Sequence, residues 1–379
     1  MTHDRLRVLV IDDFKRHRSL VTEILQSADE IEVVDVVSNG TAALSKCSEH
    51  KPAVIVLDVE APQVAPTELI EEFQRLSPTP SVIVLGSDNE SGIQAIVRAL
   101  QSGGFDSIIR PDHRDAANYN QADFSRDLLA KVRDCDPARL LNQKLRPIEN
   151  FSNRRERAER KSKLEQFQPK LIAIGASTGG PAALTKLVQL LPADAQCPIL
   201  VAQHFPGLMS SVLARHLDEI CALRVCEAVG GQLIQPGRVY LAPGDQHMRV
   251  IRLSHGNFIQ ITDEAPEKAC RPSADYLFRS LAEQFPDEVL GIVLTGRGDD
   301  GTEGARTIRQ SGGFVVTQKT PSCLVDNMPR SVEEHRLSDK TCSLAELGDF
   351  LAKFSQPTAQ PTVAPPVIET ISNPVVDTL

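Results

Sequence analysis

The stretch that decides the fold is LIAIGASTGGP, residues 171–181. Its first four residues are apolar and predict a buried strand, and the small residues after them predict a turn. Apolar residues at helical spacing follow, so we expect a strand, a turn and a helix in succession. Ser177 lies at the tip of the turn. Because ligands bind at the carboxyl ends of the strands in a parallel α/β sheet, we expect the Ser177 hydroxyl to face a ligand crevice.

Length and composition limit the class of protein. The chain has 379 residues, enough for two domains, because a single hydrophobic core stops growing at about 250 residues. A formal net charge of -9 argues against a dedicated nucleic-acid binder. No apolar run reaches the ~20 residues of a membrane helix, and the polar start MTHDRLR lacks the apolar core of a signal peptide. We therefore expect a cytoplasmic protein that is not embedded in a membrane and binds no nucleic acid.

Cysteine usage points to a reducing compartment. The eight cysteines are scattered, without a C-x-x-C pair or a repeated metal-ligand spacing. Disulfide frameworks belong to small secreted domains rather than to a chain of this size. We expect free or buried thiols.

Strand and helix patterns alternate over residues 1–135, which we expect to form one regulatory domain. The alternation predicts a doubly wound parallel sheet. Asp12, Asp13 and Asp58 follow two of its strands, so we expect three carboxylates at one edge of the sheet. Mg²⁺ would relieve their repulsion there. The predicted strands are 7–11, 31–37, 53–57, 81–85 and 107–109, and a helix at 122–132 closes the domain.

The acidic trio and the strand pattern resemble the receiver domain of two-component response regulators. The resemblance implies a flavodoxin-like fold, Asp58 as phosphoacceptor, Mg²⁺ at the three acids and a chemotaxis histidine kinase as partner. Two positions depart from the family. Gly86 stands where a Thr or Ser ends the fourth strand, and Arg110 replaces a lysine. Two interpretations stay open: control through phosphorylation of Asp58, and a docking module that is independent of phosphorylation.

A charged linker is predicted at 136–168, a catalytic domain at 169–355 and a disordered proline-rich tail at 356–379. The basic run 154–163 of the linker is interpreted as a solvated, partly helical connector. In the catalytic domain a hairpin is predicted at 248–262, with its turn at 255–257. Buried strands are predicted at 171–174, 198–202 and 289–294, and further strands at 223–228, 239–242 and 313–316.

Three strands of this domain end in reactive groups. Ser177 ends one, His204 follows the next, and Asp299 and Asp300 follow a later one. A serine hydroxyl needs a base to remove its proton, and a carboxylate holds that base in the right tautomer. These residues predict a hydrolase. The alternative is a non-catalytic, nucleotide-responsive module built on the GASTGG turn, although the G-x-G-x-x-G spacing is absent.

Six motifs carry a second resemblance, to the chemotaxis protein-glutamate methylesterase and protein-glutamine glutaminase (deamidase) family. It implies a Rossmann-like α/β catalytic domain, no cofactor for catalysis, and a receiver that covers the active-site face. The implied substrates are glutamate γ-methyl esters and glutamines on the signalling helices of methyl-accepting chemoreceptors. The motifs are GASTGGP, QHFP, APGDQHM, RPSADYLF, LTGRGDDG and Met328-Pro329.

The same resemblance assigns roles in the site. It implies Ser177 as nucleophile, His204 as base and Asp300, the acid directly before Gly301, as the orienting carboxylate. Thr178 and the backbone at Arg297 match positions that bind the oxyanion.

Overall fold

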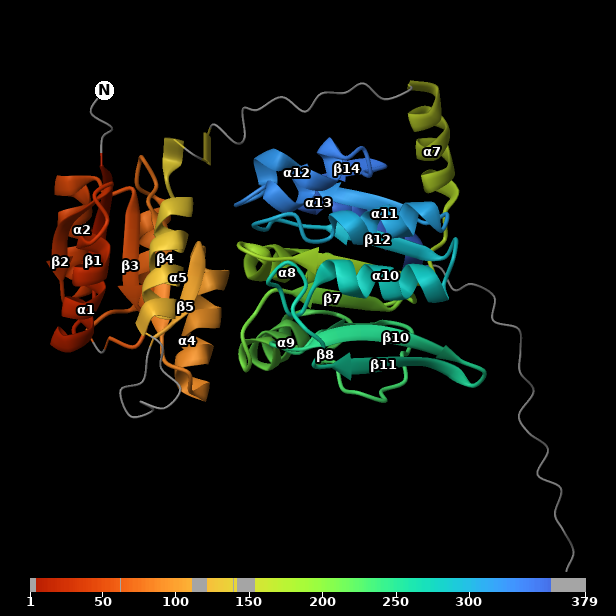
Figure 1. Ribbon diagram of the computed structural model, residues 1–379, viewed down its shortest axis with the longest axis horizontal. Helices are drawn as coiled ribbons and strands as arrows, with labels where there is room; N and C mark the ends of the chain where they lie inside the picture. The colour runs from red at the N-terminus through yellow and green to blue at the C-terminus, as the bar shows by residue number, and fades with distance from the viewer. Residues whose placement is uncertain (1–4, 62, 111–120, 139, 142–153, 356–379) are drawn as a thin grey trace, which may run out of the picture.

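A computed structural model describes residues 5–61, 63–110, 121–138, 140–141 and 154–355. The disorder predicted for 356–379 lies outside these ranges. The described residues build two parallel sheets, one in each half of the chain (Figure 1). No helix in the described ranges combines the length and apolarity needed to cross a membrane.

The N-terminal domain is a five-stranded parallel sheet with the order β2-β1-β3-β4-β5. The predicted doubly wound sheet is confirmed. Helix α3 was not predicted, because it is short and follows a proline-rich loop. The order places β1 beside β3, so the acids that follow these strands meet. The elements are β1 (Leu6–Ile11), α1 (Lys15–Gln26), β2 (Ile31–Val37), α2 (Gly40–His50), β3 (Val54–Asp58), α3 (Pro66–Gln74), β4 (Ser81–Gly86), α4 (Glu90–Gln101), β5 (Asp106–Ile109) and α5 (Gln121–Asp134).

The C-terminal domain is a seven-stranded parallel sheet with the order β14-β13-β12-β6-β7-β9-β8. The predicted α/β class is confirmed, and the short elements α12 and β14 were not predicted. The strands are β6 (Leu171–Ala176), β7 (Ile199–Gln203), β8 (Arg224–Glu227), β9 (Arg238–Leu241), β12 (Val289–Val293), β13 (Phe314–Gln318) and β14 (Lys340–Cys342). The helices are α8 (Gly180–Val188), α9 (Met209–Ile220), α10 (Ala274–Gln284), α11 (Thr302–Gln310), α12 (Asn327–Glu334) and α13 (Leu344–Ala352).

A separate hairpin joins β10 (His247–Leu253) to β11 (Gly256–Thr262). Leu253 pairs with Gly256, so the turn consists of Ser254 and His255. The prediction of a turn at 255–257 was wrong, because Asn257 pairs with Arg252 inside the ladder. Glycine suits the first position of β11, whose φ is 150°.

The connector contains helix α7 (Arg154–Gln166), which is anchored to the C-terminal domain. Arg160 Nε lies 2.6 Å from Asp339 Oδ1, and the same guanidinium stacks over the Phe314 ring at 4.7 Å. The prediction of a partly helical connector is confirmed, and the anchor at Arg160 adds a contact that was not predicted. Charge composition alone does not show that one arginine of a basic run has a buried partner.

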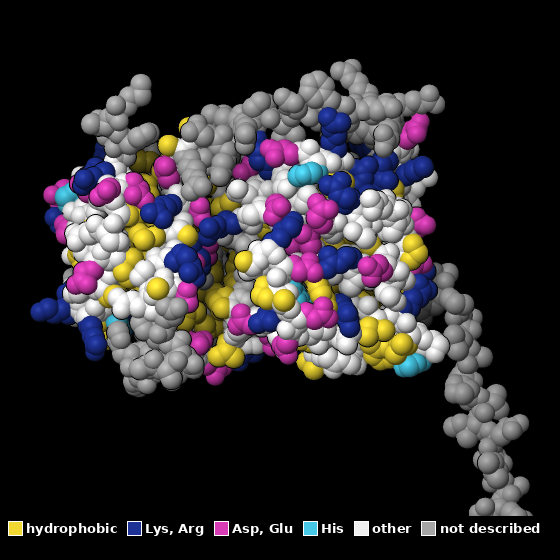
Figure 2. Space-filling model, in the orientation of Figure 1, with side chains coloured by type: hydrophobic (Ala, Val, Ile, Leu, Met, Phe, Trp, Pro, Cys, Tyr) yellow, Lys and Arg dark blue, Asp and Glu magenta, His cyan; other side chains and the backbone are white. Residues whose placement is uncertain are grey.

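The two domains pack through helix α4. It contacts α8 and α9, and one continuous cluster of buried apolar side chains runs through both domains. In Figure 1, α4, α5 and β5 lie on the side of the first domain that faces the second. Figure 2 shows basic and acidic side chains interspersed over this view of both domains. The contact between the domains therefore includes helices α8 and α9 of the second domain.

Candidate active site

Three neighbouring strands carry the predicted triad. The order β12-β6-β7 places Ser177, after β6, between Asp300, after β12, and His204, after β7. All three residues lie at the carboxyl ends of parallel strands, where α/β sheets form their ligand crevices. The fold therefore brings residues 177, 204 and 300 to one edge.

His204 and Asp300 form a direct pair. His204 Nε2 lies 2.7 Å from Asp300 Oδ2, and only 2% of the Asp300 side chain is exposed. Four further donors surround the carboxylate: Ser273 Oγ at 2.9 Å and the backbone N–H groups of Ala274, Asp275 and Gly301 at 2.7, 2.9 and 3.0 Å. Ala274 and Asp275 open helix α10, whose N-terminus favours negative charge.

These contacts fix the charge of Asp300. Burial alone would raise the pKa of its carboxyl, but the hydrogen bonds from His204 and from the start of α10 outweigh burial and lower it to about 2. Because an ionised carboxylate only accepts hydrogen bonds, His204 Nε2 is the donor of the pair. Nδ1 is then the nitrogen left to receive a proton from a nucleophile.

The surroundings of His204 favour its charged form. Burial lowers the pKa of its imidazole, but hydrogen bonding to Asp300 and to Cys270 outweighs burial and raises it to about 9. An imidazolium cannot accept the proton of a serine hydroxyl, so His204 must release one proton before it can act as a base.

Ser177 is displayed on a tight turn. Its backbone N–H donates to Thr295 at 3.0 Å, and its carbonyl accepts from Gly180 N–H at 2.7 Å. In the part of the chain that the structure describes, the Ser177 hydroxyl makes no hydrogen bond. Catalytic hydrogen bonds are often loose without substrate and tighten in the Michaelis complex. The hydroxyl is therefore unengaged.

Gln203 supports this turn and was not predicted. Its Nε2 donates to the carbonyls of Ser177 at 3.0 Å and of His204 at 3.2 Å. A Cβ on Gly180 would lie 1.8 Å from Gln203 Oε1, so the side chain reaches the turn only because position 180 is glycine. The available signal was its place beside His204 in the QHFP motif.

Thr178 and Arg297 are both engaged by the N-terminal domain. Thr178 Oγ1 donates to Asp106 Oδ2 at 2.7 Å, and Arg297 forms a 2.6 Å ion pair with Asp134. The backbone N–H groups of Thr178 and Arg297 donate to no acceptor among the described residues. The two predicted oxyanion positions therefore lie at the contact between the domains.

Asp299 points away from the pair. Its side chain is 60% exposed and forms an ion pair with Lys268 at 3.1 Å. Of the two acids that end the β12 loop, Asp300 is the one beside the histidine.

The N-terminal domain holds the acidic cluster. The structure brings Asp12, Asp58 and His17 within ligand distance of one another. His17 was not predicted, because it follows the strand by several residues and lies on helix α1. Oδ2 of Asp12 and Oδ1 of Asp13 are buried without a hydrogen-bond partner among the described residues.

The charge of this cluster is only partly compensated, because Arg110 pairs with Asp58 while oxygens of Asp12 and Asp13 have no hydrogen-bond partner among the described residues. Burial, and then the charge of Asp58, raise the pKa of Asp12 to about 7. Carboxylate oxygens without partners are the ligands that a hard cation such as Mg²⁺ prefers. The acids present therefore fit the Mg²⁺ that the family resemblance implies.

Arg110 occupies the other side of Asp58. Its guanidinium forms ion pairs with Asp58 and, at 2.9 Å, with Glu60. Ser87 N–H and Oγ donate to the same Glu60 carboxylate at 2.6 and 2.8 Å. A Cβ on Gly86 would lie 2.8 Å from Ile96 Cγ1, so an apolar side chain fills the space that a hydroxyl residue would need.

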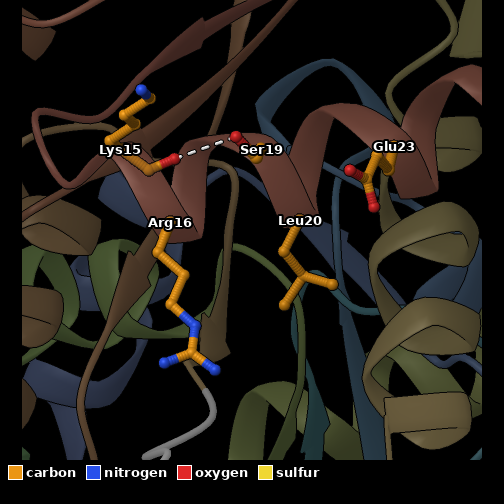
Figure 3. Close-up of a pocket in the computed structure, with 5 residues that line it drawn as sticks. All are labelled: Lys15, Arg16, Ser19, Leu20 and Glu23. Atoms are coloured by element: carbon orange, nitrogen blue, oxygen red, sulfur yellow. Dashed lines mark hydrogen bonds between the residues drawn. The ribbon is translucent and has the colours of Figure 1, made fainter.

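A surface hollow of about 450 Å³ lies on helix α1 (Figure 3). All of its lining residues belong to that helix, and the Ser19 hydroxyl donates to the Lys15 carbonyl of the same helix at 3.0 Å. In Figure 1 α1 lies in the half of the first domain that is turned away from the second. The hollow is therefore the outer face of one helix, remote from Ser177. The lining residues are Lys15, Arg16, Ser19, Leu20 and Glu23.

Each half of the chain matches the model of a known protein family. The family model for the response regulator receiver domain matches residues 8–117, and the model for CheB methylesterase matches residues 172–351. The fold and the matches define a two-domain α/β hydrolase with a receiver domain.

Full-length relatives identify the family. A protein-glutamate methylesterase/protein-glutamine glutaminase of Desulfotalea psychrophila is 34% identical over 357 residues, covering 90% of this chain and 96% of the relative. Protein-glutamate methylesterase/protein-glutamine glutaminase 5 of Myxococcus xanthus is 36% identical over 341 residues, covering 89% of this chain and 95% of the relative. The chain belongs to the protein-glutamate methylesterase/protein-glutamine glutaminase family.

A solved structure covers the C-terminal half. The crystal structure of the Thermotoga maritima CheB methylesterase catalytic domain is 33% identical, with a TM-score of 0.48, and covers 49% of this chain and 98% of that chain.

Proposed function

We propose that this chain hydrolyses glutamate γ-methyl esters on the signalling helices of chemoreceptors, releasing methanol, and that it deamidates glutamine at the same kind of site. The observation that carries the proposal is the buried His204–Asp300 pair, 2.7 Å apart, with Ser177 on the turn after the strand between them. Both family relatives are named for these two reactions.

The geometry supports a covalent mechanism. Ser177 Oγ attacks the ester carbonyl while His204 Nδ1 takes its proton, and Asp300 holds the imidazole with Nε2 protonated. The proton then passes to the departing methoxide, which leaves as methanol, or to the side-chain amide nitrogen of a glutamine, which leaves as ammonia. Water attacks the acyl-enzyme with His204 again as base and releases glutamate.

Two donors support the oxyanion. The backbone N–H groups at Thr178 and Arg297 are without acceptors in the described residues. Thr178 follows Ser177 in the chain, and Arg297 follows Gly296, where an added Cβ would lie 2.8 Å from Ser177 Cβ. A pair of such donors aimed at the carbonyl oxygen stabilises the charge that develops there. The reaction needs no metal for these steps.

Replacing Ser177 by Ala tests the proposal. Methanol release from methylated receptor membranes is expected to fall more than about 10³-fold, because a triad nucleophile has no substitute. Ser211→Ala, on the surface of α9, is the matched control and retains activity. Full activity of S177A with an unchanged melting temperature would refute the assignment.

The receiver supplies regulation in this proposal. Asp106 and Asp134 engage the residues that flank the nucleophile, so the receiver excludes a receptor helix while the domains stay closed. Separation of the domains would expose Ser177, Thr178 and Arg297 together.

Phosphorylation of Asp58 is the point on which the two interpretations of the receiver differ. Asp12, Asp13 and Asp58 would hold Mg²⁺, which screens their charge during phosphoryl transfer. Arg110 competes for Asp58, and position 86 offers no hydroxyl. These contacts favour a receiver domain that blocks the active site without phosphorylation. Control by a histidine kinase is therefore not part of the proposal.

The nucleotide-binding alternative has no support. The Gln203 side chain donates a hydrogen bond to the Ser177 carbonyl in the GASTGG turn. The next strand is followed by His204 and not by the acid that binds a ribose in nucleotide-binding folds.

A further inference from the structure

We propose that His204, Cys270 and Asp300 form a Zn²⁺ site, and that Zn²⁺ bound there switches the hydrolase off. One ligand atom from each of the three residues lies within 4.8 Å of the others. They come from three separate segments: the end of β7, the loop before α10 and the loop before α11. The cluster is therefore built by the tertiary fold and not by a local sequence motif.

A tight turn holds Cys270. Glu267 and Cys270 exchange two backbone hydrogen bonds, of 3.1 and 2.7 Å. The two residues between them, Lys268 and Ala269, have φ values of 49° and 62°. Two consecutive positive φ values define a two-residue turn that non-glycine residues adopt rarely. The position of Cys270 is thus defined by backbone pairing.

Side chains anchor the same turn beside the active site. Lys268 Nζ lies 3.0 Å from Asp275 Oδ2 and 3.1 Å from Asp299 Oδ2. Glu267 forms an ion pair with Arg279 of α10. Asp299 is the neighbour of Asp300, so these ion pairs tie the cysteine loop to the loop that supplies the carboxylate. These contacts therefore position the cysteine loop without metal.

The donor set selects zinc. A thiolate, an imidazole and a carboxylate are ligands that Zn²⁺ accepts in tetrahedral sites, with a fourth position left for water. The acids of the receiver, Asp12, Asp13 and Asp58, offer oxygen alone and suit Mg²⁺. The cluster that contains Cys270 therefore suits a softer metal ion than the acids of the receiver do.

Binding of Zn²⁺ would release protons and break one contact of the metal-free site. The Cys270 thiol gives up its proton to solvent. The imidazole binds through one ring nitrogen, which first releases any proton it carries to solvent, and the other ring nitrogen keeps its proton. The 2.7 Å contact between His204 and Asp300 opens to admit the ion. An imidazole bound to Zn²⁺ cannot accept the proton of Ser177, and catalysis stops. This consequence rests on the proposed function, whereas metal binding does not.

Cobalt tests the site directly. Co²⁺ bound to a thiolate gives a sulfur-to-metal charge-transfer band in the near ultraviolet. Titrating the reduced full-length protein with Co²⁺ is expected to give this band, and added Zn²⁺ is expected to remove it. Cys270→Ser is expected to abolish the band. Cys226→Ser, which changes another half-buried thiol, is the matched control and is expected to keep it. Equal melting temperatures show that the variants are folded.

The result that overturns the site is the absence of a band in the native protein, or an equal band in C270S. Activity tests the inhibition. Zn²⁺ is expected to lower methanol release more than tenfold in the native chain, and C270S is expected to need at least ~10-fold more Zn²⁺ for the same loss. A chelator is expected to restore activity.

Two further outcomes separate the claims. If the cobalt band forms but Zn²⁺ leaves methanol release unchanged or raises it, the inhibitory role is overturned. If the band forms and metal-free protein releases no methanol, the proposed function fails while the metal site stands.

Discussion

The Thr178 hydroxyl donates a 2.7 Å hydrogen bond to the Asp106 carboxylate of the other domain. Asp106 begins β5 of the receiver, and Thr178 follows the proposed nucleophile on the turn after β6. A carboxylate beside an oxyanion site opposes the negative charge that develops there in acyl transfer. In the proposed reaction the receiver would therefore oppose catalysis by charge as well as by covering the site.

Replacing Asp106 by Ala is expected to raise the basal methylesterase activity of the full chain. A hydrogen bond to a charged group contributes ~1.5–3 kcal/mol, so its loss shifts the closed state toward the open one by roughly tenfold or more. Initial rates of methanol release measure the effect.

Asp123→Ala is the control for Asp106, because it removes an exposed acid of α5 that pairs with Arg126 of its own helix. Its activity should match that of the native chain. Equal or lower activity of D106A would show that this contact does not close the site.

Asp134→Ala is expected to have a smaller effect that depends on salt. The Arg297 and Asp134 side chains are 36% and 20% exposed, so solvent screens their attraction. We expect a rise in basal activity of roughly two- to fivefold at low salt. Raising the ionic strength from about 0.05 M to about 0.5 M should activate the native chain more than D134A. An identical salt response of the two proteins would contradict this role.

Asp300→Asn is expected to lower kcat by a factor on the order of 10³–10⁴, because an amide no longer holds the imidazole of His204 in the productive tautomer. Asp299→Asn is a matched change one residue away, at a 60% exposed side chain that pairs with Lys268. It is expected to keep most of the activity. Equal losses in the two variants would refute the assignment of Asp300, and melting temperatures check that both fold.

Runs and spacings of apolar residues in the sequence predicted most of the strands and helices. Buried runs of apolar residues marked the strands, and the residue after each run was placed correctly at the sheet edge, as for Ser177, His204 and Asp58. The role of these residues stays a prediction. Helix α3 was missed because it follows a proline-rich loop, and strand β14 was missed because it has only three residues.

Contacts between residues that are far apart in the chain could not be predicted, because no pattern in the sequence marks them. Asp106 and Thr178 are 72 residues apart, and each is an ordinary polar residue within its own segment. Cys270 belongs to no cysteine motif, because its neighbours His204 and Asp300 arrive from other strands. Arg160 looked like one charge among many in a basic run, and only its partner Asp339 sets it apart.

A small phosphodonor with Mg²⁺ is expected to leave the methylesterase activity of the native chain unchanged. Arg110 already neutralises Asp58 and holds Glu60, and it directly follows β5, the strand that begins with Asp106. The ion pairs of Arg110 therefore keep β5 in the position that engages Thr178 without a phosphoryl group. The measurement is methanol release with and without the phosphodonor, and Asp58→Asn is the control. A rise in the native chain that is absent in D58N would show that Asp58 is the phosphoacceptor and that Arg110 yields to the phosphoryl group.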